Sequence, residues 1–392
     1  VWALSLKSRA AICCAGRLGK AIWFDSKGAS FTSSKAYFEA LPGWVNEFNT
    51  THAQQNIESV TWKTFFEPTS PAYSFFNMLN YSYQSFGGAL VGNTFPLTSA
   101  DNLENILLKT PHSNQLLLDL ALTCITQEST FKETDRMVLY VSLSTLDKVG
   151  HDFGPDSIEC IDLLYHLDDQ LKEFAQKIYE LYDEEEVLFM LTADHGVEQI
   201  PELLVDQGFN LSHRYIYPTI IEHLNKRIKN EYSLENVVIA FNEPQFYLNQ
   251  PVLNGAAADV QKAVTSLIKD YLLSLPGIRH AWTFDELENK VFASYDLNSY
   301  LQRQLFRGRS GNIIFSVSPY TAMGKHATGT SHFAQYAYDT QVPLIFYQKG
   351  ITPKKRVTDN VSMSQVPVTL ATLLNVPRPS AAAGNVLPEL PV

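Results

Sequence analysis

Short apolar runs recur along the chain, and several of them end abruptly in polar residues. The clearest run is Val187–Val197 (VLFMLTADHGV), whose apolar part stops at Asp194, His195 and Gly196. Similar runs occupy residues 1–6, 137–143, 311–317 and 342–347. Runs of this length and composition are typical of buried strands in parallel sheets. In open α/β sheets, functional groups follow the carboxyl ends of such strands.

Helical periodicity lies between these runs. Apolar residues recur at three- and four-residue steps within residues 102–126, and residues 158–181 form a long amphipathic pattern. The second pattern connects the runs at 137–143 and 187–193 as a β-α-β unit, in which the two strands are parallel. We therefore predict an α/β fold with a mostly parallel, doubly wound sheet.

Two long segments depart from this alternation. Residues 20–105 carry many aromatic residues without a long period, which is typical of a packed cap insertion. Residues 208–310 contain short strands and helices, which we interpret as an α+β insertion. We interpret residues 1–392 as a single domain that carries both insertions. Because the chain opens inside the apolar run at residues 1–6, we expect it to lack a substantial N-terminal part.

The composition excludes several classes of function. A net charge of -11 and a pI near 5.4 argue against nucleic-acid binding through bulk electrostatics. There is no run of about 18 apolar residues, so no membrane span is indicated. The cysteines show neither CxxC nor zinc-ribbon spacing. Buried free thiols are the simplest interpretation, and one disulfide is the alternative. These cysteines are Cys13, Cys14, Cys124 and Cys160.

Carboxylates and imidazoles gather where strands are predicted to end. Asp147 and His151 are four residues apart, so one turn of helix places both on one face. Asp194 and His195 follow an apolar run, and His332 lies in a Gly- and Thr-rich loop. Zinc accepts imidazole nitrogen and carboxylate oxygen, and its catalytic sites keep one position open. A single histidine at a strand end is more often structural, but three histidines and two aspartates together predict a metal site.

Three motifs resemble the metal-binding motifs of the alkaline phosphatase superfamily, in that family's order: STLDKVGHDFGP, LTADHGV and GTSHFAQYAYDTQVPLIFY. The chain looks closest to the bacterial phosphate-irrepressible alkaline phosphatases and the nucleotide pyrophosphatase/phosphodiesterases. The resemblance implies a three-layer α/β/α fold and two zinc ions. It makes Asp147, His151 and His332 ligands of one zinc, and Asp194 and His195 ligands of the other. The same ligand types also accept manganese or iron.

Lys7 and Arg9 lie two residues apart at the end of the first predicted strand. Side chains so spaced in an extended segment point the same way, so both could face one anion, although paired surface cations are common. The pair resembles the Lys-x-Arg pair that contacts phosphoryl oxygens in the monoesterase branch of the superfamily. Two such cations favour a doubly charged monoester over a singly charged diester.

Glu198 follows Asp194 by four residues and has two interpretations. It could orient a metal ligand from behind, as carboxylates around metal sites often do. It could instead be an ordinary acid near a helix N-terminus.

The resemblance implies a zinc-dependent phosphomonoester hydrolase that forms a covalent phospho-enzyme. The alternatives are a phosphodiesterase or nucleotide pyrophosphatase, and a non-catalytic metal-binding fragment. In the family, the nucleophilic Thr and one Asp ligand lie upstream of the Lys-x-Arg segment, so we expect this chain alone to be inactive. The expected partner is a small phosphate ester, and the expected location is periplasmic or secreted. Neither the physiological ester nor the oligomeric state has a signature in the sequence.

Overall fold

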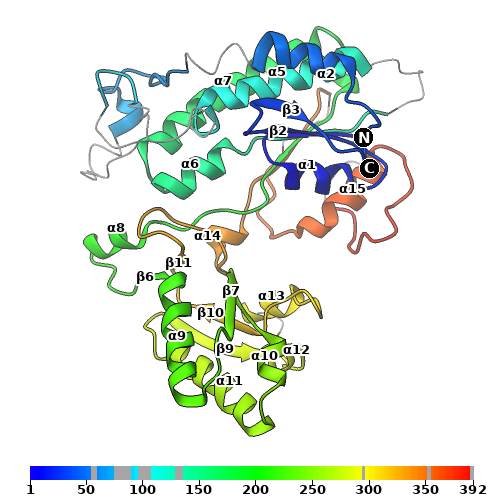
Figure 1. Cartoon of the computed structure of the whole chain (residues 1–392). Coiled ribbons are helices and arrows are strands. Elements are labelled where there is room, and N and C mark those ends of the chain that lie inside the picture. Colours follow the sequence, from blue (N-terminus) through cyan, green and yellow to red (C-terminus); the bar gives the residue numbers. More distant parts are fainter. Residues whose placement is uncertain are drawn as a thin grey trace.

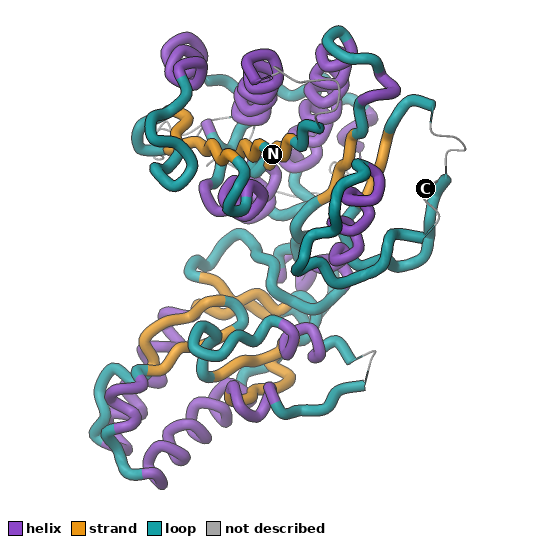
Figure 2. Tube along the Cα trace, turned by 90° about the vertical axis from the view of Figure 1, so that its right-hand side faces the viewer, coloured by secondary structure: helices purple, strands orange, loops and turns teal. Residues whose placement is uncertain are grey.

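The computed structural model describes residues 1–53, 60–74, 90–95, 107–128, 136–293, 296–350 and 355–388. The chain forms a main lobe from its N-terminal and C-terminal parts and a second lobe from its central part (Figure 1). A view turned by 90° separates the same two lobes (Figure 2). None of the described helices is long and apolar enough to span a membrane.

The main lobe is built around a short parallel sheet. The strands of this sheet are β1 (Trp2–Ser5), β2 (Lys20–Asp25), β3 (Ser30–Thr32) and β4 (Leu139–Ser142), and the lobe also contains β5 (Phe189–Thr192) and β12 (Leu344–Tyr347). β1 pairs in parallel with β2 and with β4, and β3 is antiparallel to β2. The predicted strands at residues 1–6 and 137–143 therefore lie side by side, with their carboxyl ends at the same edge.

Helices cover both faces of this sheet. The helices of the lobe are α1 (Ser8–Ala15), α2 (Gly43–Phe48), α5 (Pro111–Glu128), α6 (Thr145–Phe153), α7 (Ile158–Tyr179), α14 (Ala337–Thr340) and α15 (Val366–Leu373). In Figure 1, α1 lies on one side of the sheet and α2, α5 and α7 lie on the other. Ala3 and Ala21 meet Ala11 and Ala15, and these small side chains bring α1 close to the strands.

The opposite face of the sheet holds the largest core cluster. Leu4 and Ile22 from the strands pack with Leu117 and Leu120 from α5, and all four are at most 1% exposed. Each such side chain contributes about 1.5–3 kcal/mol when it is fully buried. The apolar spacing within residues 111–128 therefore fixes α5 on the sheet and, with it, the position of β1 and β4.

The run at residues 187–193 forms β5, but this strand has a different partner from the predicted one. β5 pairs antiparallel with β12, and within the described residues the two strands form a separate sheet. Leu191 and Ile345 remain 44% and 51% exposed. The prediction of a buried parallel strand is wrong here, because an apolar run does not specify a neighbour or a direction.

Part of the segment predicted as a loop-rich cap is regular structure. β2 and β3 extend the main sheet, and α2 and a π-helix at Asn49–Ala53 follow them. The Asn49 side chain accepts a hydrogen bond from the Phe31 N–H at 2.7 Å and donates one to the Phe31 carbonyl at 2.8 Å. Much of residues 54–106 lies outside the described residues, so the extent of the cap stays a prediction. The helix predicted over residues 102–126 is described from Pro111 onward.

The second lobe has its own antiparallel sheet. Its strands follow the order β7-β8-β10-β9, with bounds β7 (Val238–Asn242), β8 (Gln245–Leu248), β9 (Ile278–Thr283) and β10 (Ile313–Val317). Its helices are α9 (Tyr217–Tyr232), α10 (Gln250–Asn254), α11 (Ala258–Leu273), α12 (Phe284–Glu288) and α13 (Asn298–Arg303). All residues of β10 are buried, and β8 and β9 flank it. The run at residues 311–317 thus belongs to the insertion's sheet, which continues past residue 310.

Between the lobes lie two short parallel strands and one helix. They are β6 (His213–Ile216), β11 (Thr321–Gly324) and α8 (Pro201–Asp206). The long loop between β11 and α14 leads back toward the main sheet, and this loop carries His332.

All four cysteines are free. Cys124 and Cys160 are buried, as predicted. Cys13 and Cys14 are exposed, contrary to that prediction, because α1 presents its alanines to the sheet instead.

Candidate metal centre

Helix α6 carries the first two predicted ligands. The helix follows β4 directly, so its first turn lies at the carboxyl edge of the parallel sheet. Asp147 and His151 are one turn apart on the same face, and His151 Nε2 lies 3.4 Å from Asp147 Oδ1. The spacing of four residues therefore produces the juxtaposition expected of it.

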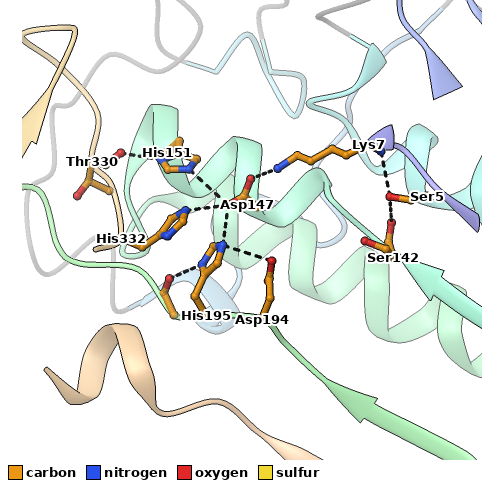
Figure 3. Close-up of polar contacts among 10 residues, drawn as sticks. Ser5, Lys7, Ser142, Asp147, His151, Asp194, His195, Thr330 and His332 are labelled. Atoms are coloured by element: carbon orange, nitrogen blue, oxygen red, sulfur yellow. Dashed lines mark hydrogen bonds and ion pairs between the residues drawn. The ribbon is translucent and has the colours of Figure 1, made fainter. Parts of the chain in front are cut away.

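Three imidazoles converge on one carboxylate oxygen, as Figure 3 shows. The Nε2 atoms of His151, His195 and His332 lie 3.4, 3.6 and 3.7 Å from Asp147 Oδ1. The rings of His195 and His332 are stacked, with centroids 3.3 Å apart. Asp147, His195 and His332 each offer a ligand atom, and these atoms all lie within 4.8 Å of one another. Nitrogen and oxygen donors at this separation suit a zinc ion.

Two of the rings are held in the tautomer that a metal ligand needs. His151 Nδ1 lies 2.8 Å from the Thr330 carbonyl oxygen, and His195 Nδ1 lies 2.8 Å from the Gly196 carbonyl oxygen. A carbonyl only accepts, so each Nδ1 must carry the hydrogen. The lone pair is then on Nε2, the atom that faces Asp147. The donor set therefore fits a zinc ion without rearrangement of these two rings.

The electrostatics of the cluster favour an ionised aspartate and a neutral histidine. Burial by itself would raise the pKa of Asp147, but hydrogen bonds from His151 and Lys7 outweigh it and hold that pKa well below its usual range. The hydrogen bond to Asp147 raises the pKa of His151. Burial, together with the neighbouring His195 and His151, lowers the pKa of His332 to about 4. His332 is therefore neutral near pH 7, as a ligand must be.

Asp194 stands at the rim of the cluster. Its side chain is 88% exposed, and its Oδ2 lies 3.5 Å from His195 Nε2. The structure brings all five predicted ligands together, but its tightest group combines Asp147 and His332 with His195. That group takes ligands from both of the predicted zinc sites. The assignment of the ligands to two separate zinc ions therefore stays a prediction.

Lys7 reaches the same cluster from the opposite side. Its Nζ donates to Asp147 Oδ2, while its backbone N–H is held by Ser5 Oγ at 2.9 Å. Lys7 itself is extended, but α1 begins at Ser8, so Arg9 lies in the first helical turn and is exposed. The argument that strand alternation points Lys7 and Arg9 the same way is therefore wrong, because the chain turns into a helix between them.

The loop that carries His332 is fastened to α6. The Thr330 N–H donates to the His151 carbonyl at 2.8 Å, while the Thr330 carbonyl receives the His151 ring hydrogen. Gly329 has a φ of +77°, and a Cβ at this position would overlap the His151 carbonyl oxygen. Glycine is thus required for the close approach that brings His332 beside His195.

A charged residue that the sequence did not single out supports the same loop. Arg214, in β6, donates from Nε and Nη2 to the two carboxylate oxygens of Glu202 at 2.6 and 2.7 Å. The same Nη2 donates to the Gly329 carbonyl at 2.7 Å. This fork joins α8, β6 and the His332 loop. A lone arginine in a strand gives no local signal for such a role.

Glu198 acts on this loop through its backbone. Its N–H donates to the Ser331 carbonyl at 3.2 Å, and its carbonyl accepts from Thr330 Oγ1 at 3.0 Å. The carboxylate is fully buried and neither oxygen has a hydrogen-bond partner in the structure. Burial raises its pKa well above the usual value, and Asp339 and Glu243 add to this shift. Glu198 precedes α8 without lying in it, so the interpretation as a helix N-terminal acid does not hold.

Known proteins share this sequence over nearly its whole length. Residues 17–339 match the family described as type I phosphodiesterase / nucleotide pyrophosphatase. Alkaline phosphatase PhoV of Synechococcus elongatus is 29% identical over 100% of this chain and 70% of its own length. Alkaline phosphatase PafA of Elizabethkingia meningoseptica is 27% identical over 99% of this chain and 70% of its own length.

A solved structure shares the fold. The crystal structure of wild-type alkaline phosphatase PafA superposes with a TM-score of 0.84 at 26% sequence identity. The match covers 99% of this chain and 74% of that one. It confirms the alkaline-phosphatase-like α/β fold that the three motifs implied.

Proposed function

We propose that this chain provides the metal centre of a zinc-dependent phosphomonoesterase. The chain belongs to the type I phosphodiesterase / nucleotide pyrophosphatase family. The family consists of hydrolases, and the two similar proteins named above are alkaline phosphatases. One observation carries the proposal: Lys7 pairs with the carboxylate on which three imidazoles converge. A cation placed at the edge of a metal centre suits the extra negative charge of a monoester.

The residues that would hold zinc are Asp147 and the four predicted ligands around it. Asp147, His195 and His332 form the tightest donor set, and His151 and Asp194 extend it. Two zinc ions are proposed from the resemblance, and manganese or iron suits the same donors. When bound, the metal supplies Lewis-acid stabilisation of charge on the phosphoryl group.

The chain's own groups would bind and orient the ester. The Lys7 ammonium donates to Asp147 Oδ2 when no ester is present, and it would donate to a phosphoryl oxygen when one is. Arg9 is exposed one residue beyond Ser8, so its guanidinium is available to a second phosphoryl oxygen. His151 and His195 hold a hydrogen on Nδ1, so in their neutral forms the Nε2 atoms are the ones that would bind a metal.

We propose that the nucleophile comes from outside residues 1–392. Several described hydroxyls near the centre are already engaged: Thr330 Oγ1 donates to the Glu198 carbonyl and Ser331 Oγ donates to Glu243. Thr145 Oγ1 pairs with Ser113 Oγ at 2.6 Å. A hydroxyl that must attack phosphorus needs a free lone pair aimed at the ester. On this proposal, the chain alone binds metal and phosphate without turnover.

The test compares the complete gene product with residues 1–392. Metal content is measured by mass spectrometry, and turnover is measured with nitrophenyl phosphate and with bis-nitrophenyl phosphate. We expect about two zinc ions per complete chain and a faster monoester reaction. Absence of bound metal at neutral pH would refute the metal proposal, and turnover by residues 1–392 would refute the external nucleophile.

A phosphodiesterase or nucleotide pyrophosphatase is the second candidate, and the description of the matched family favours it. The same assay separates the two activities, because a diesterase would process the bis-ester faster. A non-catalytic metal-binding role would leave both esters intact in the complete protein. We further propose a periplasmic or secreted location, on the resemblance alone.

A further inference from the structure

A cavity of about 330 Å³ adjoins the candidate metal centre where the two lobes meet. His195 and His332 are among the residues that line it, and so are the acids Glu243 and Asp339. Glu243 lies in the turn between β7 and β8, so the second lobe supplies this part of the wall. None of the described residues that line the cavity is a lysine or an arginine.

Asp339 is a buried acid in the wall of this cavity. The residue is only 6% exposed, and its Oδ2 accepts from the N–H groups of Phe333 and Ala334 at 3.0 and 2.8 Å. Its Oδ1 is inaccessible and has no hydrogen-bond partner in the structure. Asp339 therefore acts on the cavity through its negative charge and not through a direct contact with a bound molecule.

Glu243 is held in place beside the metal ligands. Its Oε2 accepts from Ser331 Oγ at 2.9 Å, and Ser331 immediately precedes His332. Burial raises the pKa of Glu243 to about 7, and the nearby Asp339 contributes in the same direction. A cation in the cavity would favour the ionised forms of both acids, because it offsets burial and their mutual repulsion.

These acids do not form a second metal site. Among the described residues, the group of three donors whose atoms lie within 4.8 Å of one another is Asp147, His195 and His332. Glu243 and Asp339 belong to no such group. An organic ammonium needs only one accepting carboxylate, which Glu243 can provide, and the charge of Asp339 favours a cation beside it.

We infer that this cavity receives the leaving group of the ester and selects leaving groups that carry a primary amine. The inference rests on the proposed function, since the phosphoryl group must lie at the metal centre. Lys7 then faces the phosphoryl end, while Glu243 and Asp339 face the other end. An aminoalkyl phosphate monoester, anionic at one end and cationic at the other, matches this distribution of charge.

The experiment measures binding with phosphonates, whose carbon–phosphorus bond resists hydrolysis. Calorimetry on the zinc-loaded chain compares aminoethylphosphonate with propylphosphonate, which has the same number of heavy atoms and no amine. A second pair, aminopropyl- and butylphosphonate, is one methylene longer. We expect the amine to bind about tenfold tighter in at least one pair, as one charge-assisted hydrogen bond implies.

Two substitutions test whether Glu243 causes the preference for the phosphonate that carries an amine. Glu243→Gln keeps an acceptor for Ser331 and removes the charge, so the ratio of the two affinities should fall toward one. Glu235→Gln removes the same charge from an exposed residue that pairs with Lys229, and it should leave the ratio unchanged. Equal affinities in both pairs, or a preference for the amine that survives Glu243→Gln, would overturn this inference but leave the proposed function in place. If neither phosphonate nor inorganic phosphate binds the zinc-loaded chain, the inference and the proposed function both fail.

Discussion

The ammonium of Lys7 and the carboxylate of Asp147 are paired across two elements that are 140 residues apart in the sequence. Parallel pairing of β1 with β4 brings them together, because Lys7 follows one strand and Asp147 lies in the helix after the other. From the sequence these residues are expected to have two separate roles, phosphate contact and metal binding. The pairing would link the two roles, since the Lys7 ammonium has three N–H donors and only one is used by Asp147 Oδ2.

Replacing Lys7 by Ala should separate monoester from diester hydrolysis in the complete protein. A charge-assisted hydrogen bond is worth about 1.5–3 kcal/mol, so monoester kcat/KM should fall roughly ten- to a hundredfold. Diester kcat/KM should fall less, because a diester carries one negative charge fewer. Steady-state kinetics with both esters measures this. The control is Lys349→Ala, which removes an exposed lysine that pairs with Glu184. Unchanged monoester turnover, with the diester the better substrate, would contradict the preference for monoesters.

Arg214 should act on zinc affinity without touching the metal. Its side chain is 10% exposed and joins Glu202 to the Gly329 carbonyl, three residues before His332. Groups that orient metal ligands typically change affinity by about 10–100-fold when they are removed. We expect Arg214→Gln to lower zinc affinity by this factor in a chelator competition. Arg214→Lys should restore little of it, because an ammonium cannot reproduce the fork.

The matched control for Arg214 is Arg227→Gln. Arg227 also pairs with a glutamate, Glu231, but the pair is exposed on α9. Its removal should leave zinc affinity unchanged. If the two variants lose affinity equally, or if Arg214→Gln loses stability in the metal-free state but no affinity, Arg214 is a structural residue only.

The sequence predicted the fold class and the proximity of two candidate ligands, but not the pairing of every strand. Asp147 and His151 could be placed because four-residue spacing on a helix has one geometric outcome. The direction of β5 could not be predicted, since an apolar run is compatible with parallel and antiparallel neighbours alike. Arg214 and Glu243 act through contacts between segments far apart in sequence, and such contacts leave no periodic or spacing signal.

Gly329 offers a test of the loop that carries His332. Alanine at a φ of +77° costs about 1–2 kcal/mol, and overlap of its Cβ with the His151 carbonyl adds about 1–3 kcal/mol. Gly308 has a similar φ of +85°, but nothing lies within 4 Å of a Cβ built on it. Gly308→Ala therefore reports backbone strain alone. We expect Gly329→Ala to be the more destabilising in urea unfolding and to be the only one of the two that weakens zinc binding. Equal losses from both variants would mean that the close approach to His151 contributes nothing.

Glu159, in α7, should make the stability of the chain depend on pH. It is 2% exposed, its Oε1 has no hydrogen-bond partner in the structure, and burial raises its pKa to about 7 from a usual value of 4.5. Between these two values the folded state binds more protons than the unfolded state. Its contribution to the free energy of unfolding is therefore full below pH 4.5 and declines as the pH rises toward 7.

The size of this decline follows from the shift in pKa, which corresponds to about 3 kcal/mol. Urea unfolding of the metal-free chain at a series of pH values measures it. Glu159→Gln should flatten the dependence between pH 4.5 and 7, because the amide does not titrate. Glu173→Gln, an exposed change on the same helix, should leave the wild-type slope in place. If Glu159→Gln does not reduce the slope of unfolding free energy against pH, Glu159 is ionised in the folded chain. Its charge would then be compensated by a group that the structure does not place beside it.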